Sequence, residues 1–115
     1  MASKQAVEER LRELIDRLGR DEEAARAIGR SLPDPRILAL HVTDLDVWFW
    51  TELADGMLGE LKEGEPDDPH IRVATASDDL VGFIDGGVSL FSAYVSGRIR
   101  IEASFADLLK LKRLA

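Results

Sequence analysis

The stretch GRIRIE, residues 97–102, alternates strictly between charged and apolar side chains after its glycine. Its two isoleucines, Ile99 and Ile101, fall on one side of an extended chain, and its three charged residues fall on the other. Because successive strand residues point to opposite faces of a sheet, this strand has one buried face and one solvent-exposed face. Such a strand is typical of an antiparallel sheet. We therefore expect an α+β fold.

The residues after this strand predict a helix. Ser104 to Asp107 form a Ser-x-x-Asp pattern, which is a variant of the capping box. The helix is expected to run on through four leucines, and its basic residues suit the negative end of the helix dipole. The leucines are Leu108, Leu109, Leu111 and Leu114, and the basic residues are Lys110, Lys112 and Arg113.

The middle of the chain reads as strands followed by helices. Four strands are expected, at Arg36 to Val42, Asp46 to Leu53, Met57 to Glu63 and His70 to Ala76. The short turns between the first three indicate antiparallel hairpins. Ser77 is expected to cap the helix that follows, with Asp78 and Asp79 at the positive end of its dipole. Gly86-Gly87 interrupts that helix, and a further helical stretch runs from Val88 to Val95.

The N-terminal part is expected to hold two helices. Apolar residues from Lys4 to Leu18 lie on one helical stripe, and Gly19 supplies a stop. A second, short helix is expected over Glu22 to Ile28, before Pro33 and Pro35 break the chain. The expected organisation is one domain over 1–115. Residues 1–32 form the N-terminal helices, 36–76 four strands, and 77–114 a helix-helix-strand-helix unit.

Composition and charge exclude several classes of protein. The chain has 115 residues, 45% of them hydrophobic and 32% charged, which is the balance of an ordinary globular domain. Its net charge of −7 argues against nucleic acid and anionic membrane surfaces as partners, because both need a local basic patch. The chain has no cysteine, signal-peptide pattern or spanning apolar run, so we expect a soluble, cytoplasmic protein without stable membrane insertion.

No pattern in the sequence indicates catalysis, a metal or a cofactor. His41 and His70 are the only histidines, and neither has a partner at metal-ligand spacing. His41 is expected to be a hydrogen-bonded or half-exposed strand residue, and His70 to face solvent. No nucleophile elbow or phosphate loop occurs. We therefore expect a protein that is not an enzyme, although acid-rich loops leave that class as a minor alternative.

The run Trp48-Phe49-Trp50 places aromatic side chains on both faces of its strand. Phe49 is in phase with Val47 and Leu53 on the expected core face, so both tryptophans lie on the other face. Three accounts of the tryptophans stay open. The N-terminal amphipathic helix covers them, or they form a homodimer contact, or they stack on a ligand.

The second half of the chain resembles the sterol carrier protein type 2 family. The resemblance lies in the strand and Ser-Asp-capped helix of residues 71–80, in Asp85-Gly86, in the GRIRIE strand, and in the leucine- and lysine-rich end of the chain. It covers roughly Ile71 to Leu114, and it is weaker before that. Two positions depart from the family's pattern. Ser96 stands where glutamine is frequent, and Ala103-Ser104 stands where a Gly-Asn pair closes the strand.

The resemblance implies a five-stranded, mainly antiparallel sheet with helices packed on one face. It also implies a tunnel between sheet and helices for an apolar or amphipathic lipid, such as a fatty acid, an acyl-CoA or a sterol, without a catalytic residue, metal or cofactor. The residues expected to line the tunnel are Phe49 (in its floor), Phe83, Ile84, Val88, Phe91, Val95, Phe105, Leu108 and Leu109. The alternative is that these side chains fill one another's space. The domain would then be an interaction or dimerisation module that works through Trp48 and Trp50.

An empty tunnel would lower the stability of a domain of this size. A cavity of about 300 Å³ lies near the low end of ligand pockets. If it stayed empty and rigid it would cost roughly 7 kcal/mol, at about 24 cal/mol per Å³. Net stabilities of such domains are only about 5–15 kcal/mol. The ligand-free protein is therefore expected to collapse its pocket, to carry a lipid from its host, or to be noticeably unstable.

Overall fold

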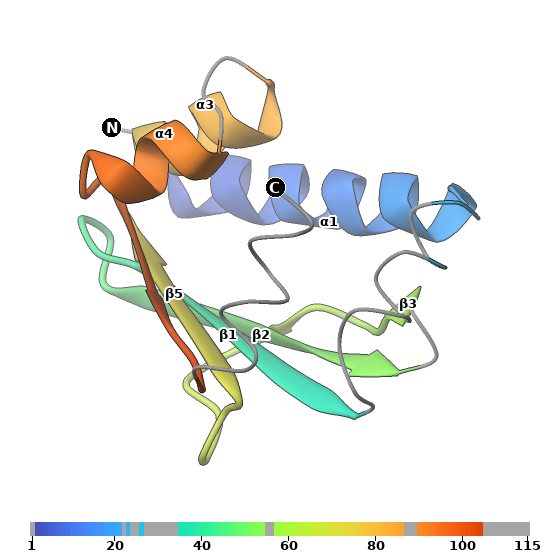
Figure 1. Ribbon diagram of the computed structural model, residues 1–115. Coiled ribbons are helices and arrows are strands. Elements are labelled where there is room, and N and C mark those ends of the chain that lie inside the picture. The colour runs from blue at the N-terminus through green and yellow to red at the C-terminus, as the bar shows by residue number, and fades with distance from the viewer. Residues whose placement is uncertain are drawn as a thin grey trace.

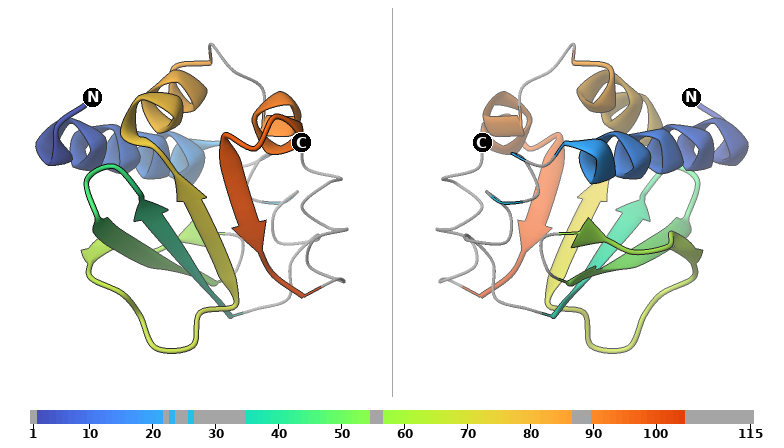
Figure 2. Two further views of the ribbon diagram at one scale, coloured as in Figure 1. Left: turned by 90° about the vertical axis from the view of Figure 1, so that its left-hand side faces the viewer. Right: turned by 90° about the vertical axis from the view of Figure 1, so that its right-hand side faces the viewer.

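The computed structural model describes residues 2–21, 23, 26, 35–54, 57–86 and 90–104, without the side chains of residues 90 and 91. The elements follow one another in the order α1 (Lys4–Arg20), β1 (Arg36–Val42), β2 (Val47–Ala54), β3 (Met57–Leu58), β4 (Lys62–Glu63), β5 (Ile71–Thr75), α3 (Ser77–Ile84), α4 (Leu90–Val95) and β6 (Ile99–Glu102). The helices α1, α3 and α4 lie on the same side of the sheet (Figures 1 and 2). The expected α+β fold is confirmed.

The sheet is mixed, with strand order β3-β2-β1-β5-β6, and β4 pairs with β2 beside β3. All pairs are antiparallel except β1 with β5. The expectation of five mainly antiparallel strands is therefore wrong in its strand count, and it missed the parallel pair. The parallel pair arises because the chain after β4 returns to the end where β1 begins. There the His70 N–H donates to the Ile37 carbonyl at 3.0 Å, and β5 then runs beside β1.

The sixth strand comes from an interruption of the expected strand Met57 to Glu63. Leu58 lies opposite Leu53 and Lys62 lies opposite Trp50, so three residues, 59–61, face only two on β2. This is a β-bulge. It is held by the Gly59 N–H, which donates to the Glu52 carbonyl at 2.8 Å, and by Thr51 Oγ1, which donates to the Gly59 carbonyl at 3.0 Å. The bulge lets Leu61 enter the core while Lys62 stays on the outside.

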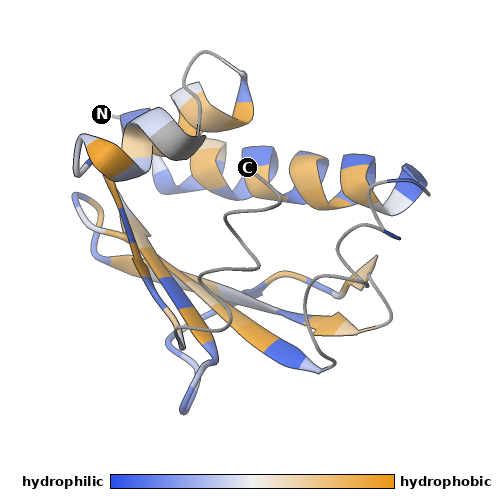
Figure 3. Cartoon of the chain, viewed as in Figure 1, coloured by the Kyte–Doolittle hydropathy of each residue, from blue (hydrophilic) through white to orange (hydrophobic). Residues whose placement is uncertain are grey.

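The two faces of the sheet differ in what covers them. We call the side that carries Phe49 the inner face, because Phe49, Val7 and Leu11 share one buried cluster. The side that carries Trp48 and Trp50 is the outer face. The strands are banded in apolar and polar residues as this alternation requires (Figure 3). The apolar stripe of α1 therefore covers the Phe49 side, and the account in which it covers the tryptophans is wrong.

Helix α1 confirms the expected N-terminal helix and ends at Arg20 rather than at Leu18. Ser3 caps its start, since Ser3 Oγ accepts from the Ala6 N–H at 3.1 Å. Gly19 is not the stop, because the helix continues through it. At the N-terminal end, Lys4 Nζ lies 2.8 Å from Glu63 Oε1, and this hydrogen bond raises the pKa of Lys4 above its ordinary value. The helix is thereby tied to β4.

Helix α3 begins at Ser77, but Ser77 does not cap it. The N-cap is Ala76, which makes no side-chain bond. The oxygen for the first turn comes from Asp44 in the β1–β2 turn, where Asp44 Oδ1 accepts from the Ser77 N–H at 2.8 Å. Asp78 and Asp79 lie in the first turn as expected. The expected helices over Glu22 to Ile28 and after Ser104 lie outside the described residues, apart from Glu23 and Arg26.

Candidate functional site

The residues expected to line a tunnel are in different surroundings. Phe49 is fully buried and Ile84 is 6% exposed, and both belong to the cluster beneath α1. Phe83 on α3 is half-buried, and Val95 on α4 is 67% exposed. The remaining positions lie outside the described side chains, and they are Val88, Phe91, Phe105, Leu108 and Leu109. The structure therefore brings Phe49 and Ile84 together.

The cluster around Phe49 is a closed core. Its buried members come from α1, β1, β2, α3 and the bulge, and they are Val7, Leu11, Val42, Phe49, Leu61, Leu80 and Ile84. Each is at most 8% exposed. Cores of this kind are close-packed, and their contribution to stability comes from apolar area removed from water. This part of the inner face serves stability.

A second apolar cluster lies elsewhere on the inner face, and its rim is only partly buried. Leu53 and Ile71 are at its centre, at 1% and 3% exposed. The partly buried residues around them are Leu38, Leu58, Val73, Ile101 and Ala103. In the part of the chain that the structure describes, this cluster is made of strand residues and Ala103, without a member from a helix.

Register makes the second cluster continuous across the sheet. Leu38 lies opposite Ile71, and Val73 lies opposite Ile101, so side chains of β1, β5 and β6 stand side by side on one face. The nearby hydroxyls already have partners, since Thr51 donates to Gly59 and Thr75 Oγ1 donates to the Arg98 carbonyl at 3.0 Å. The surface therefore offers hydrocarbon contact to a ligand.

Sequence reasoning missed the residues of the second cluster. The alternation of Ile99 and Ile101 did indicate a buried face on β6. The partners of that face, Leu38 and Val73, follow only from the parallel pairing of β1 with β5. That pairing joins segments more than thirty residues apart, and no local pattern predicts it. The local signal that the sequence offers is the alternation of apolar residues along each strand, which shows which face of the strand is buried but not which strand lies beside it.

The outer face carries aromatic side chains that have partners within the chain. The rings of His41 and Trp48 are stacked, with centroids 4.5 Å apart and planes 9° apart. Lys62 Nζ lies 4.7 Å from the centroid of the Trp50 ring, a cation–π contact. Both tryptophans are half-buried. These contacts account for part of the aromatic surface without a ligand or a second chain.

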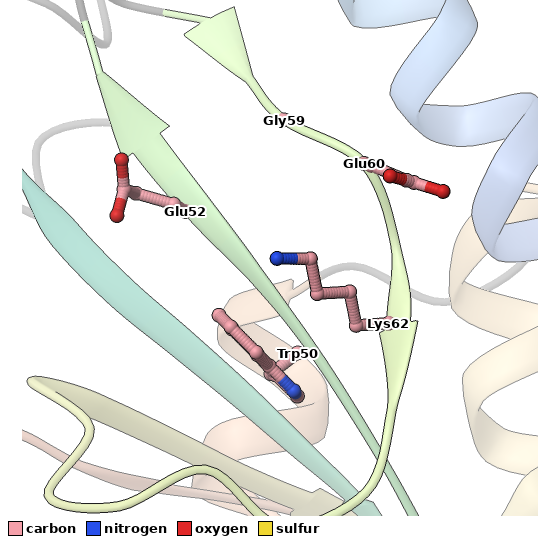
Figure 4. A pocket seen from close by; sticks show the side chains of 5 residues that line it. All are labelled: Trp50, Glu52, Gly59, Glu60 and Lys62. Atoms are coloured by element: carbon pink, nitrogen blue, oxygen red, sulfur yellow. The ribbon is translucent and has the colours of Figure 1, made fainter.

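An open groove of about 270 Å³ lies beside the bulge, lined by Trp50, Glu52, Gly59, Glu60 and Lys62 (Figure 4). Lys62 reaches back toward β2 above the Trp50 ring, so a cation of the chain itself already occupies that ring face. The groove exists because the bulge moves residues 59–61 out of line with β2. We attribute its shape to the bulge and do not assign it a ligand.

The two histidines are used in hydrogen bonds. His41 Nε2 lies 3.1 Å from Asp46 Oδ1, which confirms a hydrogen-bonded strand histidine. His70 is exposed, as expected, but its Nδ1 accepts from the Ile37 N–H at 2.9 Å. Among the described residues, no group of three or more His, Cys, Asp or Glu side chains could hold a metal ion. The described helices are also too short or too polar to cross a bilayer.

Asp44 is a carboxylate whose titration is changed by the fold. Ser77 Oγ donates to Asp44 Oδ2 at 2.6 Å, and the Ser77 N–H donates to Oδ1. These bonds hold the pKa of Asp44 below its ordinary value, chiefly through the side-chain bond. Ser77 is itself fully buried, and its Oγ accepts from the Ala2 N–H at 3.1 Å. The arrangement joins three segments of the chain and is structural.

Comparison with known proteins assigns the fold. No protein-family model matches the chain. Hydroxysteroid dehydrogenase-like protein 2 from Mus musculus is 29% identical over 105 residues, covering 84% of this chain and 21% of the mouse protein. The chain therefore spans about a fifth of the length of that relative.

Solved structures match over almost the whole chain. Sterol carrier protein 2 like 2 from Aedes aegypti has a TM-score of 0.71 at 15% identity, covering 97% of this chain and 98% of that one. The same Aedes protein in a palmitated form has a TM-score of 0.57 at 14% identity, covering 88% and 89%. The ubiquinone synthesis protein UbiJ-SCP2 has a TM-score of 0.69 at 14% identity, covering 96% and 92%. The chain has the fold of sterol carrier protein 2, which confirms the fold expected from the resemblance.

Proposed function

We propose that this chain is a non-catalytic, cytoplasmic carrier that binds an apolar or amphipathic lipid against the inner face of its sheet. The candidates are a fatty acid, an acyl-CoA or a sterol. The observation that carries the proposal is the second cluster, where Leu38, Val73 and Ile101 form a continuous aliphatic surface that is only partly buried.

The fold supports a lipid ligand. A structural match of this chain, the Aedes protein, was solved in a palmitated form. The proposal extends that chemistry to the second cluster, and it retains the sequence-based expectation that the apolar residues at 88, 91, 105, 108 and 109 also line the site. Phe49 then belongs to the closed core that lies elsewhere on the same face.

The chemistry of the surface sets the expected affinity. Burying about ten methylene groups at about 0.8 kcal/mol each yields roughly 8 kcal/mol before the costs of association. Because the costs of association are subtracted from this gain, a dissociation constant of about 1 μM, which the full 8 kcal/mol would give, is the tightest binding expected. Because the hydroxyls of Thr51 and Thr75 already have acceptors, chain length should govern affinity more than the polar head group does.

The first experiment asks whether lipid accompanies the protein. The chain is purified without detergent, extracted with organic solvent, and the extract is examined by mass spectrometry against an extract of an unrelated protein of equal size. A lipid present at near one equivalent per chain supports the carrier. If no lipid is found and no fatty acid, acyl-CoA or sterol binds or raises the melting temperature, the carrier proposal fails.

The second experiment locates the site with two matched variants on one strand. Val73 is half-buried on the inner face of β5, whereas its neighbour Arg72 is exposed on the outer face. Val73→Trp should fill the site and weaken binding of a fluorescent fatty acid at least tenfold. Arg72→Trp adds the same ring on the other face and should leave binding within twofold. Equal losses in both variants would place the ligand elsewhere.

A second candidate function is a homodimer formed through the outer face. The observation that favours it is the position of Trp48 and Trp50 on the side of the sheet opposite to α1. Light scattering of the purified chain tests it, with Trp48→Glu expected to convert dimers into monomers. A monomer at all concentrations would remove this candidate and leave the carrier proposal untouched.

A further inference from the structure

The outer face of the sheet carries two exposed charges that are unpaired in the described part of the chain. Arg72 lies opposite Glu102 on β6 and opposite Ala39 on β1, which places all three on the face of Trp50. Neither Arg72 nor Glu102 has an ion pair or a side-chain hydrogen bond among the described residues. Helices α1, α3 and α4 lie over the other face (Figure 1). The outer charges are therefore available to a second molecule.

One row of outer-face residues crosses the whole sheet. From β6 to β4 the row consists of Glu102, Arg72, Ala39, Trp50 and Lys62. The two ends of the row carry opposite charges, and its centre is a small side chain. Turned end for end, the row sets acid against base and guanidinium against indole. The row is therefore complementary to its own reverse.

The neighbouring row shows the same relationship in size. Ala74 on β5 lies opposite His41 on β1, and His41 lies opposite Trp48 on β2. When this row is reversed about β1, the small Ala74 faces the large Trp48. Side chains of two packed sheets interdigitate, and a small residue across from a large one allows this. Charge and size thus favour the same arrangement.

We propose that two copies of the chain pack outer face against outer face, about a two-fold axis that runs along β1. This axis places β6 of one copy over β4 of the other, so Glu102 meets the partner's Lys62 and Arg72 lies beside the partner's Trp50. Arginine and tryptophan are both enriched in interfaces. The inference rests on the second candidate function, the homodimer, and adds its arrangement.

The charges distinguish this axis from the other two-fold arrangement of the same face. An axis that crosses the strands would set Arg72 against the partner's Arg72 and Glu102 against the partner's Glu102. Like charges across an interface are costly, and opposite charges fix the relative orientation of the two partners. A two-fold interface uses the same patch on both copies, as this complementarity requires.

Weak association is expected. Neighbouring strands lie about 4.8 Å apart, so Glu102 on β6 and Lys62 on β4 are separated by four strand spacings, or about 19 Å, within one chain. A face of this width gives an interface at the small end of the known range, where complexes are weak. Single ion pairs at an exposed rim add little. The dissociation constant of the dimer should lie at about 10–100 μM.

The test exchanges the charges at the two ends of the row. Analytical ultracentrifugation of the full chain, from about 10 μM to about 1 mM, measures the dissociation constant. Glu102→Lys and Lys62→Glu each set like charges against each other across the axis, so each should weaken the dimer at least fivefold. The double variant restores opposite charges, and its dissociation constant should return to within threefold of the parent's. A contact inside one chain cannot produce this rescue, because the two residues are about 19 Å apart there.

The control keeps the net charge and moves one exchange to the helix side of the molecule. Glu13 is exposed on α1, and Glu13→Lys should leave the dissociation constant within twofold. Glu13→Lys combined with Lys62→Glu has the net charge of the parent, and it should remain as weak as Lys62→Glu alone. Equal rescue by both double variants would show that net charge alone acts, and it would overturn the arrangement.

The outcomes separate the arrangement from the two candidate functions. A monomer at all of these concentrations removes the homodimer and this arrangement together, whereas fatty-acid binding by the inner face is unaffected. If Trp48→Glu abolishes the dimer but the double variant of Glu102 and Lys62 gives no rescue, the outer face still associates and the axis along β1 is wrong. Fatty-acid affinity and the urea midpoint of every variant should match the parent, which shows that each variant is folded.

Discussion

Ser77 Oγ donates a hydrogen bond of 2.6 Å to Asp44 Oδ2 across 33 positions of the sequence. The same Ser77 hydroxyl accepts from the Ala2 N–H, and the Ser77 N–H donates to Asp44 Oδ1. One buried hydroxyl thus joins the start of the chain, the β1–β2 turn and the start of α3. These bonds set how α1 and α3 sit over the sheet.

Ser77→Ala should destabilise the protein by about 1–3 kcal/mol, because it leaves the Ala2 N–H without its acceptor and takes a donor from Asp44. Urea denaturation followed by tryptophan fluorescence measures the loss. The variant Ser3→Ala removes a hydroxyl from an exposed helix cap and should cost about 1 kcal/mol. A Ser77→Ala variant as stable as the parent would mean that water replaces the hydroxyl at no cost.

The low pKa of Asp44 predicts a specific response to acid. Its hydrogen bonds favour the charged form, so its contribution to stability is fully present above the ordinary pKa of 3.8 and is lost as pH falls through the lower folded value. Asp44→Asn should therefore be less stable than the parent at pH 7, and the difference should shrink below pH 3.8. Urea denaturation of Asp44→Asn and of the parent at a series of pH values measures this convergence, and a difference that stays constant down to about pH 3 would contradict the prediction.

Phe49 and Val73 should separate stability from ligand binding. Phe49 is fully buried in the closed cluster, so Phe49→Leu should cost roughly 1–2 kcal/mol while fatty-acid affinity changes less than threefold. Val73→Trp should weaken fatty-acid binding while it leaves the free energy of unfolding nearly unchanged. The measurements are denaturation midpoints and fluorescent fatty-acid titrations on the same preparations. Lost affinity without lost stability in Phe49→Leu would return Phe49 to the floor of the ligand site, as sequence reasoning had it.

Local patterns predicted the strands and the faces of the sheet well. The bounds of β1 are those expected from sequence, and Phe49 lies on the face opposite to Trp48 as the alternation requires. The buried side of β6 was also predicted, since Ile99 is buried and lies opposite Thr75. These features depend on the two-residue period of a strand, which can be recognised from consecutive residues alone.

The features that sequence missed depend on contacts between distant residues. The amphipathic stripe of α1 shows that the helix covers an apolar surface, but it does not say whether Phe49 or Trp48 lies on that surface. Ser77 had the composition of a cap, yet Asp44 supplies the capping oxygen from 33 residues away. The proposed lipid site could not be predicted from sequence for the same reason, because Leu38 and Val73 meet only through the parallel pairing of β1 and β5.

The bulge at residues 59–61 can be removed without changing any other pairing. Deleting Glu60 leaves two residues opposite Thr51 and Glu52, while Leu58 stays opposite Leu53 and Lys62 stays opposite Trp50. β3 and β4 should then join into one strand, with Leu61 still on the inner face. We expect the deletion to cost no more than about 1 kcal/mol, because it removes one exposed residue and leaves the core intact. Amide hydrogen exchange should show protection extending through the joined strand.

Deleting Leu61 instead shortens the bulge by the same one residue but turns Glu60 toward the core. It removes a side chain that is only 7% exposed, and a carboxylate would have to be buried in its place. Because loss of a buried leucine alone costs about 2–5 kcal/mol, this deletion should unfold at much lower urea than the Glu60 deletion. Equal stabilities would show that the inner face does not require Leu61, and that the bulge serves the outer groove beside Trp50 rather than the core.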